Sequence, residues 1–150
     1  MTVSPVLTPT SRLRFGFSQT DITPPADTYH RLWGAARQDQ ATGIHRPLRA
    51  SVTALAQLHD ETGAERRLLV ALDLCLLRPP EMDALRDAVE RLADVRRDRI
   101  AFTFSHTHAS GNFSRGRSHL PGGERIGPYL DRLPSLIADA IQVAVQSMQP

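Results

Sequence analysis

One stretch decides the fold of this chain: Arg99–His108, RIAFTFSHTH, followed by Ala109–Asn112, ASGN. The apolar residues predict a buried strand over 99–105, which stops at two histidines. Side chains alternate between the two faces of a strand, so His106 and His108 are expected to point the same way and Thr107 the other way. Ligands bind at the carboxyl ends of strands in open α/β sheets. We therefore expect at least one of these histidines to bind a catalytic metal, with zinc as the first candidate.

The segments before this strand predict two more strands and a helix. Residues 50–58 alternate between apolar and polar, residues 67–74 are almost continuously apolar, and a turn-like segment separates them, which is typical of an antiparallel hairpin. A helix is expected to begin at Pro79–Pro80, where a missing N–H costs little. Its apolar stripe consists of Met82, Leu85, Val89 and Leu92. A strand, a helix and a strand in this order indicate a right-handed crossover, with 67–74 and 99–105 paired in parallel.

Both ends of the chain add an element to this sheet. Near the beginning, Leu13, Phe15 and Phe17 alternate with polar or small residues, which predicts a half-buried strand with these three on its apolar face. A strong helical stripe runs over 129–148, and Pro134 is expected to kink or split that helix. The predicted fold class is α/β: a mixed sheet with an antiparallel hairpin and a β-α-β crossover, with helices packed on it.

The length of 150 residues is that of one domain. We expect a loose lead-in over 1–11 and one α/β unit over 12–150. The formal net charge is +2, aromatic residues make up 5% of the chain and there is no long basic run, so a nucleic-acid-binding protein is not expected. No apolar run approaches 18 residues, which predicts no transmembrane segment. No signal peptide is apparent, so we expect a cytoplasmic location.

Four polar residues are the candidates for chemistry. Asp73 interrupts an apolar run, and a buried carboxylate is rare unless it is paired or liganded, so we expect it beside His106. His45, between Gly43 and Pro47, is a weaker candidate. The alternative for the histidine pair is structural: one ring bonded to the backbone and the other solvated. The lone Cys75, between two leucines, is expected to be a buried, inert thiol.

The remaining histidines and two loop arginines have no supporting context. His30, His59 and His119 are expected at the surface. Arg115 and Arg117 could bind an anionic group of a substrate, although solvated charges on a loop are the commoner arrangement.

Four segments, in order along the chain, resemble motifs of the neutral/alkaline non-lysosomal ceramidase-like family: Phe15–Pro25 (FGFSQTDITPP), Gly43–Ala50 (GIHRPLRA), Leu69–Asp73 (LVALD) and Ser105–Gly111 (SHTHASG). The resemblance implies a zinc-dependent amidase fold in which His106 binds the metal and His108 is a neighbouring functional group. His108 and Asp73 are then the expected catalytic residues, and His45 the expected substrate contact. The implied substrate is a small N-acyl or sphingolipid-like molecule.

In that family a second histidine, a glutamate, a tyrosine and an arginine complete the site. All four lie further along the family's chain than the segments matched here. We therefore expect this chain to supply only the amino-terminal part of a catalytic domain. Either the rest of a longer chain or a second copy would cover the surface that this leaves open. The alternative function is a non-catalytic α/β binding or assembly module derived from the family.

Overall fold

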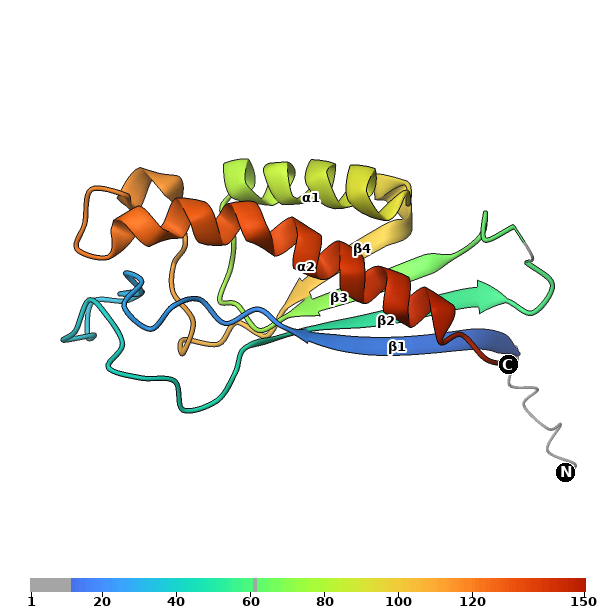
Figure 1. Cartoon of the computed structure of the whole chain (residues 1–150), viewed down its shortest axis with the longest axis horizontal. Helices are drawn as coiled ribbons and strands as arrows, with labels where there is room; N and C mark the ends of the chain where they lie inside the picture. The colour runs from blue at the N-terminus through green and yellow to red at the C-terminus, as the bar shows by residue number, and fades with distance from the viewer. Residues whose placement is uncertain (1–11, 61) are drawn as a thin grey trace, which may run out of the picture.

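The computed structural model describes residues 12–60 and 62–150, so the predicted lead-in over 1–11 lies outside the described residues. A four-stranded sheet has the order β1-β2-β3-β4, and two long helices and three short 3₁₀ turns complete the fold (Figure 1). In chain order the elements are β1 (Leu13–Asp21), β2 (Arg49–Gln57), β3 (Arg67–Leu72), α1 (Pro79–Ala93), η1 (Arg97–Arg99), β4 (Ile100–Phe104), η2 (Arg115–Arg117), η3 (Gly123–Arg125) and α2 (Ile126–Gln146).

The sheet is mixed, as the sequence predicts. β1 pairs antiparallel with β2, and β2 pairs antiparallel with β3, which confirms the hairpin. β3 and β4 pair in parallel, with Leu68 opposite Ile100 and Leu72 opposite Phe104. Since α1 connects these two parallel strands, the predicted β-α-β crossover is also confirmed.

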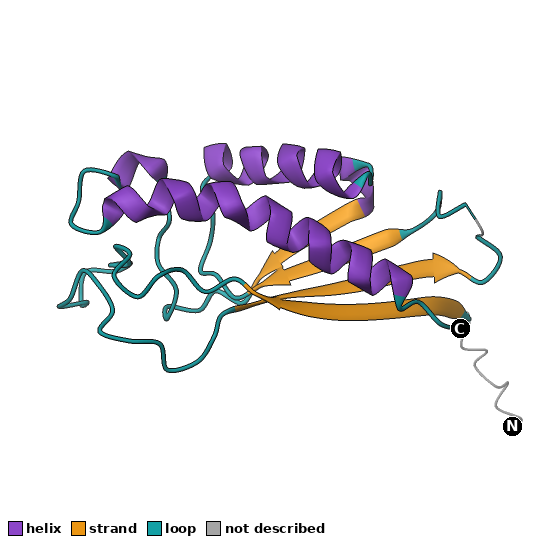
Figure 2. Ribbon diagram, in the orientation of Figure 1, coloured by secondary structure: helices purple, strands orange, loops and turns teal. Residues whose placement is uncertain are grey.

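Both helices cover the same face of the sheet (Figure 2). Their apolar stripes meet the alternate side chains of the strands in one core, which includes Val52 of β2, Val70 of β3, Val89 of α1, and Ile137 and Ile141 of α2, each at most 1% exposed. The molecule is therefore a two-layer α/β structure. No described residue forms a helix or strand over the opposite face of the sheet.

The prediction for the apolar face of β1 is wrong. Leu13, Phe15 and Phe17 lie on the open face of the sheet and are exposed, whereas Gly16 and Ser18 face α2 and are buried. The reason is the close approach of α2. A Cβ atom on Gly16 would overlap the carbonyl oxygen of Ala144, so no larger side chain fits there. The Ser18 hydroxyl donates a hydrogen bond of 2.6 Å to the carbonyl of Ala140 on the same helix.

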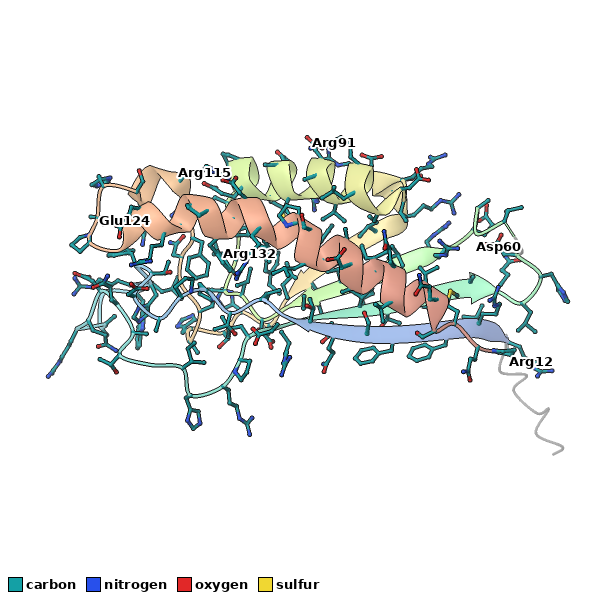
Figure 3. The ribbon with its side chains drawn as sticks, viewed as in Figure 1. Arg12, Asp60, Arg91, Arg115, Glu124 and Arg132 are labelled. Carbon is teal, nitrogen blue, oxygen red and sulfur yellow. The ribbon has the colours of Figure 1, made fainter. Side chains whose placement is uncertain are left out.

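The helix predictions need two smaller corrections. α1 begins at the two prolines and buries Met82, Leu85 and Val89, but Leu92 is exposed because it falls at the outer edge of the stripe. Figure 3 shows the charged side chain of Arg91 on the outer side of this helix. α2 is not split: it runs unbroken through Pro134, whose ring is buried among the apolar residues packed against the sheet and α1. No described helix is long and apolar enough to span a bilayer.

The segment between β1 and β2 has little regular structure, as expected, and it is fixed to the sheet at the end where the site forms. The Thr23 hydroxyl and, at 2.8 Å, the Thr23 N–H hydrogen-bond the Asp21 carboxylate, and these two bonds lower the pKa of that carboxyl group. The Thr23 hydroxyl in turn accepts from the Leu48 N–H at 2.8 Å. The buried Tyr129 hydroxyl donates to the carbonyl of Ile22 at 2.8 Å. The residues of the Asp-Ile-Thr motif therefore have a structural role: they connect the end of β1 to Leu48 and to α2.

Candidate metal centre

The candidate site lies where β3 and β4 end side by side. Leu72 and Phe104 are paired at the ends of these strands, and the Ser105 N–H extends the pairing by donating to the Leu72 carbonyl at 3.0 Å. The two segments that follow, Asp73–Cys75 and Ser105–His108, leave the sheet together. The prediction that Asp73 and His106 lie at neighbouring strand ends is confirmed for the backbone.

His106 has an unusual backbone conformation that aims its ring at the first of these segments. Its φ of +54° is in the left-handed region, which costs a non-glycine residue about 1–2 kcal/mol. In this conformation its Nδ1 lies 3.1 Å from the carbonyl oxygen of Cys75. The Cys75 Sγ atom lies 3.6 Å from Nδ1 and 3.9 Å from Nε2 of the same ring.

His108 brings a second ring to this position. The ring centroids of His106 and His108 are 5.4 Å apart, and the His108 ring also lies against Trp33 at 5.7 Å. One ligand atom from each of Cys75, His106 and His108 can be chosen so that all three lie within 4.8 Å of one another. Both histidines are exposed and Cys75 is 3% exposed. The two rings thus lie close together, as predicted. The backbone that carries them is not a strand, however, because β4 ends at Phe104 and His106 has a left-handed conformation.

Ser110 connects the two segments. Its hydroxyl is 1% exposed, accepts a hydrogen bond from the Cys75 N–H at 2.8 Å and donates one to the Thr107 carbonyl at 3.2 Å. A single buried hydroxyl therefore couples Cys75 to the loop that holds both histidines. Ser110 has no distinctive signal in the sequence, since serine is common in loops.

The expectation of a buried thiol for Cys75 is confirmed. The thiol is buried, and burial raises its pKa, which lowers its reactivity as a nucleophile. Its contact with His106, 31 positions further along the chain, was not predicted. The available signal was its place two residues after Asp73, at the end of a strand expected to pair with 99–105.

Asp73 and His45 belong to a cavity that the two histidines do not line. This cavity has a volume of about 590 Å³, and its walls include Asp73, His45 and Thr107. The Asp73 carboxylate accepts the Arg49 N–H at 3.1 Å, and His45 is exposed at the rim. The structure therefore does not bring the Asp73 side chain into the cluster of Cys75 and the histidines, and its catalytic role stays a prediction.

His30 is a residue that sequence reasoning missed. It was expected at the surface, but it is half-buried and lines both the large cavity and a second one of about 370 Å³, which His108 and Trp33 also border. Its Nδ1 atom is buried without a hydrogen-bond partner among the described residues. His30 thus lies between the histidine pair and the cavity that holds Asp73. His59 and His119 are exposed, as predicted.

The two loop arginines are engaged within the chain. Arg115 forms an ion pair with Asp131 of α2, and Arg117 donates to the carbonyl of Arg31 at 2.8 Å and lies over the ring of Tyr29. Figure 3 shows Arg115 beside the two helices. The hypothesis that these arginines bind an anionic group thus gains no support from their contacts.

Comparison with solved structures gives the fold. No family model matches the chain, and no curated protein matches it in sequence. The neutral ceramidase from Pseudomonas aeruginosa superimposes with a TM-score of 0.70 at 21% identity over 95% of this chain. The chain has a ceramidase-like fold. A second structure, a ceramidase complexed with C2, superimposes with a TM-score of 0.68 at 20% identity over 94% of this chain.

The predicted resemblance is therefore confirmed at the level of the fold. This chain spans only 22–23% of the two ceramidase chains that it matches. Within the ceramidase-like fold, the cluster of Cys75, His106 and His108 lies at the carboxyl edge of the parallel strand pair.

Proposed function

We propose that this chain provides the metal-binding part of a zinc-dependent amide hydrolase that acts on an N-acyl, sphingolipid-like substrate. The observation that supports it is the pair of exposed imidazoles at the carboxyl end of parallel strands in a ceramidase-like fold. His106 is the proposed metal ligand and His108 its functional neighbour.

The donor chemistry fits zinc. Imidazole nitrogen is a good ligand for this ion, whereas magnesium and calcium prefer several oxygen ligands. No carboxylate of the described residues belongs to the cluster. A bound zinc ion would act as a Lewis acid that polarises the amide carbonyl of the substrate.

The other residues of the site would handle the substrate and its proton. His108 is exposed and borders the second cavity, where it can hold a proton for the departing amine. The large cavity has walls that include Ile44, Leu48 and Phe113, and about 590 Å³ is within the usual range for a small-molecule site. We assign the acyl portion of the substrate to this cavity, with His45 at its rim and Asp73 at its polar end.

The test measures zinc and hydrolysis together in matched variants. Wild-type protein should bind about one zinc ion per chain by elemental analysis, and His106→Ala should bind none. His119→Ala, an exposed histidine outside the cluster, is the control and should behave like wild type. Retention of stoichiometric zinc by His106→Ala would refute the metal assignment. Zinc binding without hydrolysis of any of a series of fluorogenic N-acyl substrates would refute the hydrolase assignment for this chain.

A second candidate function, a non-catalytic assembly module, is supported by the open face of the sheet. Leu13, Phe15, Phe17 and Leu69 are 42–52% exposed there, and the register places Phe15 opposite Leu55 in one apolar patch. Strands of five to nine residues, spaced about 4.8 Å apart, make a face of roughly 450 Å². Two copies packed face to face would bury roughly 900 Å², which is below the usual range for stable complexes, so we infer a weak homodimer.

Sedimentation velocity over a range of concentrations tests this second candidate. Wild-type protein should show concentration-dependent association that Phe17→Ser abolishes. Val143→Ser is the matched control, since Val143 is 54% exposed on α2, away from the patch. A wild-type protein that stays monomeric at all concentrations would rule the homodimer out.

A further inference from the structure

We propose that Cys75 is a thiolate ligand of the same metal ion, so that Cys75, His106 and His108 form a three-ligand site contained entirely within this chain. The inference deepens the proposed function, on which it rests for the position of the metal. It differs in two respects: His108 binds the ion instead of holding a proton beside it, and no residue beyond these three is needed to hold the ion.

The hydrogen bond of the His106 ring determines which of its nitrogens can bind a metal. Nδ1 lies 3.1 Å from the Cys75 carbonyl oxygen, which can only accept, so Nδ1 must carry the proton. The lone pair of the neutral ring is then on Nε2. Metal-binding histidines commonly have this arrangement, with one ring N–H bonded to a backbone carbonyl and the other nitrogen on the ion.

The distances within the cluster are slightly longer than those of a closed zinc site. Zinc bonds of about 2.3 Å to sulfur and about 2.05 Å to nitrogen, at a tetrahedral angle, separate the two ligand atoms by about 3.5 Å. The Cys75 Sγ atom lies 3.9 Å from His106 Nε2. The full set lies within 4.8 Å, and the His108 ring is exposed. Small rotations of side chains therefore suffice to close the site around an ion.

The surroundings of Cys75 favour a ligand over a residue that merely fills space. Its N–H donates a hydrogen bond to the Ser110 hydroxyl, and its carbonyl accepts one from the His106 ring. Both backbone polar groups of Cys75 are therefore connected to the loop that carries the histidines. The left-handed backbone of His106 is maintained at a cost, and it produces this contact. The Sγ atom is left facing the imidazole ring that carries the free lone pair.

Binding through sulfur changes the charge of the site in a defined way. The thiol exchanges its proton for the divalent ion, so a Cys–S–metal bond forms and one proton is released to solvent. One thiolate and two imidazoles select zinc over magnesium or calcium. Three protein ligands leave the fourth position of a tetrahedral ion open, which is the pattern of catalytic zinc sites.

Cobalt(II), which replaces zinc and absorbs light, tests the sulfur ligand directly. Titration of the 150-residue chain with cobalt should produce a near-ultraviolet sulfur-to-cobalt charge-transfer band, and this band should be absent from Cys75→Ala. The variant should also bind zinc more than about 100-fold more weakly, since even residues that only support a ligand contribute about 10–100-fold. His119→Ala is the control and should keep the band. Thermal unfolding without metal verifies that the variants are folded.

A second measurement on wild-type protein keeps the inference testable if Cys75→Ala fails to fold. X-ray absorption of the zinc complex of wild-type protein should show a sulfur neighbour of the metal at about 2.3 Å, and a spectrum with only nitrogen and oxygen neighbours would overturn the sulfur ligand. Absence of the charge-transfer band, or zinc affinity unchanged in Cys75→Ala, would overturn the sulfur ligand and leave the His106 assignment intact. Presence of the band without hydrolysis of N-acyl substrates would support the ligand and count against the proposed function alone.

Discussion

The hydroxyl of Ser110 offers the sharpest test of how the site is built. Ser110→Ala removes an acceptor for the Cys75 N–H and a donor to the Thr107 carbonyl while leaving the backbone unchanged. Ser110 is 1% exposed, so water is poorly placed to replace the hydroxyl. A buried N–H left without a partner costs about 1–3 kcal/mol, and the second hydrogen bond contributes about 1 kcal/mol. We expect the free energy of unfolding to fall by about 2–4 kcal/mol.

Thermal and urea denaturation measure this loss. At about 2–4 °C per kcal/mol for a domain of this size, the melting temperature should fall by about 4–16 °C. Ser147→Ala is the matched control: its hydroxyl also bonds two backbone groups, the Phe17 N–H at 3.2 Å and the Ala144 carbonyl at 2.9 Å, but the residue is exposed. Its effect should stay below about 1 kcal/mol. Equal effects of the two substitutions would refute the reasoning from burial.

Ser110→Ala should also weaken metal binding, which a purely structural serine would not do. Zinc affinity, measured at a temperature at which the variant is fully folded, should drop about 10-fold because the Cys75 segment is no longer coupled to the histidine loop. Unchanged zinc affinity would mean that Ser110 stabilises the fold without positioning the site.

Two further predictions concern the packing of α2. Tyr129→Phe removes the bond to the Ile22 carbonyl and should cost about 1–2 kcal/mol at neutral pH. Burial raises the pKa of Tyr129, so above about pH 10 the unfolded chain loses a proton that the folded chain keeps. The free energy of unfolding of the wild-type protein should therefore fall as the pH rises. Urea denaturation at pH 8 and pH 11 should show that Tyr129→Phe lacks this part of the decline. Gly16→Ala should lower the free energy of unfolding by about 1–3 kcal/mol, because the added Cβ overlaps the Ala144 carbonyl. Gly34 has open space around it, so Gly34→Ala should lower the same quantity by less than about 0.5 kcal/mol. Equal effects of the two substitutions would contradict the close approach of α2 to β1.

The sequence by itself determined the order of the main elements and two of the strand pairings. Periodicity of two over 50–58 and an apolar run over 67–74 predicted the hairpin, and the helix before 99–105 predicted parallel pairing. These are local signals, because the spacing of apolar residues depends on the geometry of a single strand or helix. The sequence likewise placed the two histidines next to the carboxyl end of a strand, which is where the structure has them.

The tertiary structure alone decided which side chains meet. Leu13, Phe15 and Phe17 have the pattern of a buried face, yet α2 approaches so closely that the small residues Gly16 and Ser18 lie beneath it instead. The contact between Cys75 and His106 follows from the tertiary structure, because the two residues are 31 positions apart and meet through a left-handed turn at His106. Asp73 follows the strand that pairs with β4, but its carboxylate accepts a hydrogen bond from the Arg49 N–H instead of contacting His106. Such contacts depend on backbone conformation and on packing between distant segments, which residue patterns along one strand do not encode.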